Sequence, residues 1–550
     1  MDGRFRPWAR RAAPLAAWLS LATVLVSVSV LSFAGARPAN LDDAFIVLVY
    51  ARHLLSDLSL SWNAGDGPVE GFTSPLDLLV KAFALIASPA DPIRATFRLN
   101  VALHAALPLL AAATAVLAAK GRPFATRFLA ALAAGLLAAT SPALAEGASF
   151  LLEAPLVAFT LTALAAYGGL AEAPRPWVLA ALAVLAAMAR PEGLPLAAGL
   201  LAVPALRPSG RQAALRGALL AGGAVALLFA LRFVVFGEFV PNTYFAKSST
   251  SRLLEARDGL SYVLTYVREG PPGSRFLPLL ALLPALALAP GWFSPFARRR
   301  FALLSSLAVS SLGLIVLAGG DSYGGGRFLA GSLSLAFVAL TFALADTTGL
   351  ARGVALSVAM LVLAGPIEVS LREAEARRAL IRDTWPVRHE HFECDRQIAR
   401  SLEALLGTGT VAQSDYQKLK YFADGLRVVD LQGLNDRAIA HEPWPGPVRW
   451  GKYRHAHGVR EAAPIWIFGY RTELHETPLA DAGIERALTD EAVWSRHIGY
   501  APEAADAEAI RRLYAAASLP VCGKYFDVLV RRDVAQELAS KGLLVEPGAR

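Results

Sequence analysis

The chain has 550 residues, of which 55% are hydrophobic and only 18% are charged, and its mean hydropathy is +0.44. This balance excludes an ordinary water-soluble globular protein and indicates an integral membrane protein. The net charge of +8 does not indicate nucleic-acid binding, because much of the arginine lies in short loops between apolar segments, where it acts as a topology signal.

The first apolar segment, about 13–33, follows a group of arginines, which predicts a cytoplasmic N-terminus. The tripeptide Ala34-Gly35-Ala36 resembles a signal-peptidase site. However, the apolar run before it is about 20 residues long, whereas a secretory apolar region has roughly 7 to 15. We therefore expect an uncleaved membrane anchor.

Further apolar segments of spanning length recur until about residue 370, and basic loops between them are expected inside. The expected spans after the first are 97–118, 128–144, 154–170, 177–189, 193–206, 213–236, 276–290, 301–318, 328–345 and 353–370. The segment 76–90 is short and contains Asp77 and Lys81, so we predict an interfacial helix on the outer surface. These segments predict a polytopic α-helical membrane domain over 1–370, with about eleven spans.

On this topology the polar segments that contain glycine or proline fall on the outer face. They are LDDAF (41–45), VEGFTSPL (69–76), SFLLEAP (149–155), RPEG (190–193), VPNTYFAK (240–247) and GGDSYGGGRF (319–328). The inner loops are short and basic, so function is expected outside. The glycine-rich segment lacks the Lys-Ser/Thr pair of a nucleotide loop and instead suggests close backbone approach to a ligand.

Asp42 and Asp43 precede the apolar run FIVLVYARHLL, where one carboxylate is expected to cap a helix. Adjacent helical residues diverge by about 100°, so both cannot point the same way. We therefore predict one structural carboxylate and one that faces a cavity as a general base.

Three outer segments supply cations, at Lys247, Arg190 and Arg327. Cations around a carboxylate base suit a reaction in which a lipid phosphate leaves. The alternative is that these side chains are interfacial anchors, as is common near span ends.

Residues 371–550 have ordinary composition and predict a soluble α/β domain, with a helix over 372–406 and β-rich runs at 410–415, 426–434, 463–470 and 524–530. Cys394 and Cys522 are the only cysteines, and in an oxidising compartment we expect a disulfide between them; two reduced thiols are the alternative. The paired histidines at 389/391 and 455/457 lack a recognised zinc spacing. The aromatic residues Trp444, Trp450, Tyr453 and Trp466 suit either sugar stacking or core packing.

Six segments, in this order, resemble the bacterial terminal β-(1→2)-arabinofuranosyltransferase-like proteins of the GT-C superfamily. They are LDDAFIVLVYARHLL, LSWNAGDGPVEGFTSPL, RPEG, VPNTYFAK, GGD followed by RFL, and VVDLQGLNDRAIA. The resemblance covers roughly 40–460. It implies a GT-C-like fold in the bacterial inner membrane, with the site and the C-terminal domain on the periplasmic face.

The resemblance further implies an inverting enzyme that transfers arabinofuranose from a polyprenyl-phosphate donor to an envelope glycan, with Asp42 ahead of Asp43 as base. It also points to substrate-binding residues within the shared segments. These are Arg52, Glu70, Arg190, Glu192, Asn242, Tyr244, Lys247, Asp321, Arg327, Asn435 and Asp436. A turn or cap role is equally open for Asn435 and Asp436. No cofactor is implied, although paired carboxylates also bind divalent cations.

Two departures from the family pattern leave the sugar and the acceptor open. Asp77 stands after TSPL, where an aromatic residue is expected, and SYGGG replaces a bulkier run after GGD. A transporter or lipid flippase would share the apolar composition, but no inverted repeat is evident and the polar motifs gather on one face. A glycan-assembly scaffold without catalysis would leave the architecture unchanged.

Overall fold

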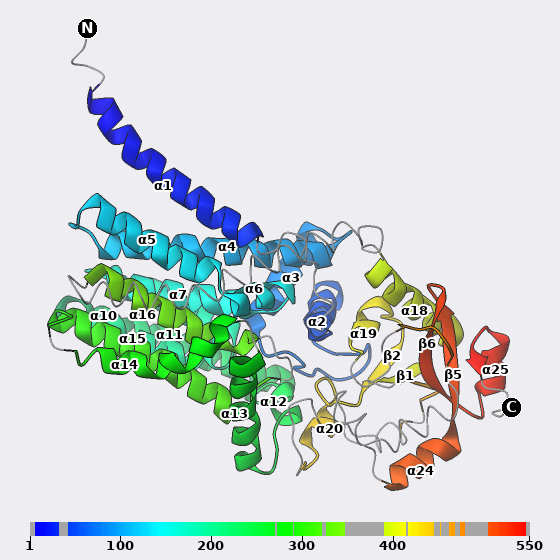
Figure 1. Ribbon diagram of the computed structural model, residues 1–550. Coiled ribbons are helices and arrows are strands. Elements are labelled where there is room, and N and C mark those ends of the chain that lie inside the picture. The colour runs from blue at the N-terminus through cyan, green and yellow to red at the C-terminus, as the bar shows by residue number, and fades with distance from the viewer. Residues whose placement is uncertain are drawn as a thin grey trace. The chain divides into compact units, whose positions relative to one another are not determined.

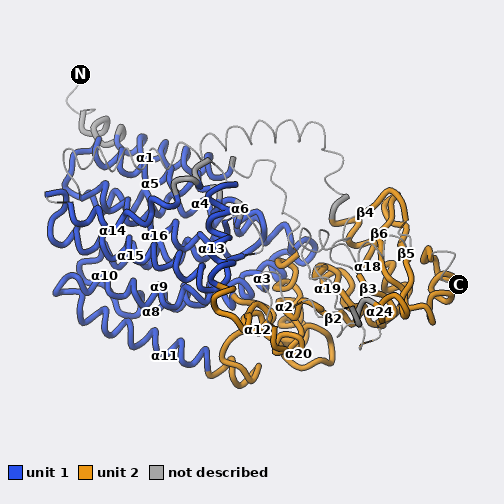
Figure 2. Tube along the Cα trace, turned by 60° about the horizontal axis from the view of Figure 1, so that its bottom comes forward, with its two compact units in different colours: residues 1–39, 74–229, 256–383 blue, residues 40–73, 230–255, 384–550 orange. Residues whose placement is uncertain are grey.

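The computed structural model describes residues 6–31, 42–269, 272–289, 291–321, 326–346, 390–413, 416–444, 452, 461, 463–467, 474–478 and 504–545 (Figure 1). The chain forms two compact units, coloured separately in Figure 2. Unit 1 contains Met1–Ala39, Ser74–Phe229 and Ala256–Asp383, and unit 2 contains Asn40–Thr73, Ala230–Glu255 and Thr384–Arg550.

Unit 1 is helical. Its helices are α1 (Arg6–Leu31), α3 (Pro75–Ala87), α4 (Pro92–Ala118), α5 (Phe124–Ala139), α6 (Pro142–Ser149), α7 (Ala154–Leu170), α8 (Pro176–Ala189), α9 (Gly193–Leu200), α10 (Ala202–Ala205), α14 (Leu283–Leu286), α15 (Pro295–Leu317) and α16 (Ala330–Asp346). Short 3-10 helices occupy Pro208–Gly210, Pro272–Leu282 and Arg327–Leu329. Two helices, α11 (Arg211–Phe236) and α13 (Arg252–Glu269), continue across the boundary between the units.

Four helical stretches among the described residues are long and apolar enough to cross a membrane. They are Pro92–Ala118, Pro208–Phe236, Pro295–Leu317 and Arg327–Asp346. A fifth is added if Phe124–Ala139 and Ala143–Ser149, which bend by 53°, form one broken span. The protein is thus a membrane protein with a helical unit and a sheet-containing unit.

The expected count of about eleven spans is not confirmed. Most of the other expected spans correspond to shorter apolar helical stretches of 10–17 residues: Pro14–Val30, Ala154–Leu170, Pro176–Ala189, Gly193–Ala205 and Leu277–Leu286. Proline at helix starts and in the segment 190–195 limits several of them, because proline cannot donate a backbone hydrogen bond. The expected span 353–370 lies outside the described residues.

The segment expected to lie at the interface forms α3, whose charged residues point into unit 1. Asp77 and Lys81 are fully buried and form an ion pair of 2.7 Å. Leu79, Phe83 and Ile86 are instead half-exposed or more. This polarity is the reverse of that of a helix on a soluble protein, and it suits an apolar face turned toward lipid.

Unit 2 is built around a sheet of seven strands among the described residues, in the order β2-β1-β3-β6-β5-β7, with β4 also paired to β6. The strands are β1 (Thr410–Gln413), β2 (Arg427–Asp430), β3 (Ile465–Ile467), β4 (Leu474–His475), β5 (Tyr514–Val521), β6 (Lys524–Arg531) and β7 (Leu544–Val545). β1 pairs with β2 and β3 in parallel, and the remaining pairs are antiparallel. The predicted α/β character is therefore present.

The other elements of unit 2 among the described residues are helices, namely α2 (Asp43–Asp57), α12 (Asn242–Ala246), α18 (Glu390–Leu406), α19 (Lys418–Phe422), α20 (Arg437–His441), α24 (Ala504–Leu513) and α25 (Ala535–Ser540). The expected disulfide joins Cys394 of α18 to Cys522, with Cα atoms 5.9 Å apart. Trp466 is fully buried in the sheet's core, so of its two expected roles it takes packing.

Unit 2 does not have the same extent as the C-terminal domain that the sequence predicts over residues 371–550. It includes 40–73 and 230–255, which lie between apolar helices in the chain. Phe45 of α2 packs against Tyr421 and Phe422 of α19, with ring centroids 5.4 and 5.6 Å apart. Two of the segments expected to carry function therefore fold together with the C-terminal sheet.

Candidate functional site

Asp42 stands at the start of α2 without capping that helix through its side chain. Its carboxylate instead accepts hydrogen bonds from the backbone N–H groups of Gln417 and Lys418, at the start of α19. Burial raises the pKa of Asp42 to about 6, against the opposing effect of the Lys418 ammonium and the two N–H groups. Asp42 thus joins the start of α2 to the start of α19 through its side chain. Which of the two aspartates acts as a base stays a prediction.

A buried polar network continues from this point. Gln417 donates through Nε2 to Asp430 Oδ1 at 2.9 Å, and Asp430 Oδ2 accepts from the backbone N–H and side-chain amide of Asn435 at 2.8 and 3.0 Å. Tyr50 of α2 donates to Asn435 Oδ1 at 3.2 Å. Burial raises the pKa of Asp430 to about 6. The side chain of Asn435, which was expected to bind substrate, therefore makes hydrogen bonds within the protein.

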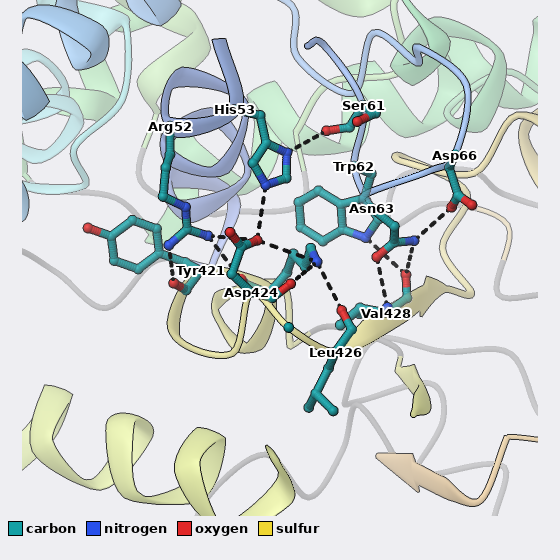
Figure 3. Close-up of polar contacts among 12 residues, drawn as sticks. Arg52, His53, Ser61, Trp62, Asn63, Asp66, Tyr421, Asp424, Leu426 and Val428 are labelled. Atoms are coloured by element: carbon teal, nitrogen blue, oxygen red, sulfur yellow. Dashed lines mark hydrogen bonds and ion pairs between the residues drawn. The ribbon is translucent and has the colours of Figure 1, made fainter. Parts of the chain in front are cut away.

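Arg52 was also expected to bind substrate, but it fastens α2 to the segment after α19. Figure 3 shows Arg52 and His53 pointing from α2 toward Asp424, with nitrogen–oxygen distances of 3.1 and 3.0 Å. The other ring nitrogen of His53 lies 2.9 Å from the carbonyl oxygen of Ser61. The hydrogen bond that the His53 ring donates to the Asp424 carboxylate raises the pKa of His53. This cluster holds two distant segments together.

Glu70 and Arg232 form a buried bidentate ion pair, with distances of 2.7 and 3.0 Å. Asn242 donates through its side chain to the carbonyl oxygens of Gly433 and Leu434, both at 2.9 Å, and through its backbone to that of Glu70. Glu70 and Asn242 therefore position the loops that join unit 2 rather than offer free groups to a ligand.

These contacts shape a cavity of about 480 Å³ within unit 2. It is lined by Trp62, Asp66, Gly67, Pro68, Val69, Val235, Phe236, Gly237, Asn435, Asp436 and Arg437. Val235 and Phe236 end the apolar helix α11, and the remaining walls come from the segments 62–69 and 435–437. The volume lies within the roughly 300–1,000 Å³ typical of ligand sites.

Of the expected binding residues, Asn435 and Asp436 line this cavity. Asp436 also caps α20 by accepting a hydrogen bond from the backbone N–H of Ile439 at 3.0 Å. The sequence interpretation missed Asp66 and Arg437. Both lie in segments that carry the family resemblance, LSWNAGDGPVEGFTSPL and VVDLQGLNDRAIA. Asp66 stands between two glycines, and this pattern first indicates a turn.

The expected cations of unit 1 are already neutralised. Arg190 is paired with Glu153 and Glu192, and Arg327 forms a bidentate pair with Asp321 at 2.5 and 2.8 Å. The central part of the glycine-rich segment, 322–325, lies outside the described residues. A phosphate would have to displace these carboxylates before it could bind either guanidinium.

In unit 2, Lys247 is half-buried and has no carboxylate partner among the described residues. Tyr244 is 45% exposed and accepts a hydrogen bond from Arg252 at 3.0 Å. Of the three expected cations, Lys247 is thus the one whose charge is available to an anion.

The described residues contain no group of three or more His, Cys, Asp or Glu side chains arranged to hold a metal ion. His389, His455 and His457 lie outside the described residues, as do Trp450 and Tyr453. A divalent cation bound by the aspartate pair therefore stays a prediction. No protein-family model, curated protein sequence or solved structure matches the chain.

Proposed function

We propose that the protein is an inverting membrane glycosyltransferase that uses a polyprenyl-phosphate sugar. In this proposal arabinofuranose passes to an envelope glycan at the extracytoplasmic face of the bacterial inner membrane. The cavity of unit 2 carries the proposal, because it combines the apolar end of α11 with polar side chains from two loops. A sugar acceptor that meets a lipid-linked donor at the membrane suits a site with an apolar and a polar wall.

Asp43 is the proposed base, because both carboxylate oxygens of Asp42 accept backbone hydrogen bonds. Asp43 removes the proton from an acceptor hydroxyl, and the oxygen forms a bond to the anomeric carbon. The bond from that carbon to the phosphate oxygen breaks, and the phosphate leaves with the electron pair. Lys247 is the proposed partner of the departing phosphate, because it has no carboxylate partner among the described residues.

The test is sugar transfer by the full chain in lipid vesicles, with decaprenyl-phosphoryl arabinofuranose as donor and an arabinofuranosyl oligosaccharide as acceptor. Asp43→Asn should lower the rate by roughly 10²-fold or more, the usual contribution of a general base. Asp57→Asn, at an exposed position at the end of α2, should leave it unchanged. If the native chain transfers no sugar from this donor, the proposal fails.

A transporter or lipid flippase is the second candidate, and one observation favours it. Unit 1 buries several ionisable side chains, including Asp77, Lys81, Glu153 and Arg327, as transport pathways do. Each of these side chains has an oppositely charged partner among the described residues. Movement of labelled lipid across vesicles, unaffected by Asp43→Asn, would support this candidate over the enzyme.

A further inference from the structure

The charges around the cavity of unit 2 distinguish between possible ligands. Asp66 and Asp436 supply two carboxylates to the lining, and Arg437 supplies the guanidinium. Arg437 is already paired with Glu238 at 2.8 Å and donates to the carbonyl oxygen of Phe236 at 3.2 Å. Asp66 in turn lies 3.8 Å from the guanidinium of Arg427, which also pairs with Glu461 at 2.8 Å. Four carboxylates thus surround two guanidiniums at the polar wall, and this charge balance disfavours a phosphate and favours an uncharged group that donates hydrogen bonds.

Asp66 is held in a fixed orientation by Asn63. The carbonyl oxygen of the Asn63 side chain accepts from the backbone N–H of Val428 at 2.8 Å, and its amide donates to the Val428 carbonyl oxygen at 3.1 Å. The same amide donates to Asp66 Oδ2 at 3.0 Å (Figure 3). Gly65 supplies the positive φ of +85° that this turn requires. The Asp66 side chain nevertheless remains 42% exposed.

The opposite part of the lining is apolar. Pro68 and Val69 contribute from one loop, and Val235 and Phe236 from the end of α11. A sugar ring presents C–H groups on its faces and hydroxyl groups on its rim, so it can contact both walls at once. A phosphate diester has no such apolar face.

We propose that this cavity binds an uncharged sugar ring of the acceptor glycan, with a ring hydroxyl donating to Asp66, and that it excludes the phosphate of the donor. The identity of the sugar as an acceptor rests on the proposed function. The binding of a neutral sugar depends only on the cavity, and it can therefore be tested without turnover.

The test measures binding to the full chain in detergent by ligand-observed NMR, with a neutral arabinofuranosyl trisaccharide and with arabinose 5-phosphate as probes. The neutral probe should bind at least about tenfold more tightly. Asp66→Asn keeps the size of the side chain and an acceptor for Asn63, and should weaken binding by roughly tenfold, as loss of a charged hydrogen-bond acceptor does. Asp57→Asn is the matched control.

A second variant tests the cavity by filling it with a larger side chain. A Cβ at Gly67 meets no heavy atom within 4 Å and the residue's φ is ordinary, so Gly67→Phe can place a ring in open space without disturbing the fold. It should abolish binding of the neutral probe. Tighter binding of the phosphate probe, or unchanged binding of the neutral probe to both variants, would overturn the inference. Sugar transfer with no binding here would refute only this inference, whereas binding with no transfer by the native chain would refute only the proposed function.

Discussion

The carboxylate of Asp42 accepts a 2.9 Å hydrogen bond from the backbone N–H of Lys418, 376 residues further along the chain. Its other oxygen accepts from the N–H of Gln417. These N–H groups begin a short helix and have no partner within it, so the carboxylate satisfies donors that would otherwise lack one. Asp42, which was expected to act on a substrate, thus joins the start of α2 to the start of α19.

Asp42→Asn should therefore destabilise unit 2. An asparagine offers one acceptor oxygen, and its amide group would face a second N–H donor. The expected loss is about 1–3 kcal/mol, the cost of an unsatisfied buried polar group. Thermal unfolding of the full chain in detergent measures it, with the near-UV signal of unit 2 as readout. Asp57→Asn, at an exposed position at the end of α2, serves as the matched control and should stay within about 0.5 kcal/mol; equal effects of the two variants would contradict the assignment.

The buried Asp430 predicts a pH dependence of stability. Burial raises its folded-state pKa to about 6 from the ordinary value of 3.8, so between these values the folded chain binds more protons than the unfolded chain. Its stabilising contribution is complete below about pH 4 and is lost as the pH rises to about 6. The loss is on the order of 3 kcal/mol.

Asp430→Asn tests this linkage because asparagine does not titrate. Unfolding midpoints measured from pH 4 to pH 7 should fall with rising pH for the native chain, and should fall less steeply for the variant. Part of the slope should persist, because burial also raises the pKa of Asp42. A variant whose stability changes with pH as strongly as that of the native chain would show that Asp430 does not titrate in this range.

Several features could be predicted from local sequence alone. The β-rich runs at 410–415, 426–434 and 463–470 contain β1, β2 and β3, the run 524–530 covers all but the last residue of β6, and the two cysteines had only each other as partners. Apolar periods also located the helices of unit 1. These features depend on composition and on neighbours in the chain, which a single sequence records.

The partners of the charged residues could not be predicted in this way. Arg190 was recognised as a cation near a span end, but its pairing with Glu153 depends on how two helices pack. The association of Asn63 with Val428 likewise joins residues 365 positions apart. One sequence gives no measure of such long-range contacts, so the candidate binding residues were identified without knowing which of them were already occupied.

The ion pair between Asp77 and Lys81 makes a prediction for unit 1. Both side chains are fully buried, so Lys81→Met should leave an uncompensated carboxylate and cost about 3–5 kcal/mol. The double variant Asp77→Asn/Lys81→Met should recover most of that loss, since it removes both charges. Denaturation of the single and double variants in one detergent gives the coupling energy. Additive effects would refute the pairing.

The contact between Gly71 and the buried network makes the last prediction. A Cβ at Gly71 would overlap the side-chain oxygen of Asn435 and lie 2.7 Å from the hydroxyl of Tyr50. Both neighbours are fixed by hydrogen bonds, so neither can move away without breaking one. Gly71→Ala should therefore cost about 1–3 kcal/mol, as overpacking of a core does.

Gly67→Ala is the matched control, because the same added methyl group meets no heavy atom within 4 Å. Its unfolding midpoint should stay near that of the native chain, while that of Gly71→Ala falls. Since Asn435 forms part of the cavity wall, Gly71→Ala should also weaken binding of the neutral trisaccharide. If Gly71→Ala unfolded at the same temperature as the native chain, Gly71 would not lie in close contact with Asn435. The position of Asn435 in the cavity wall would then be contradicted.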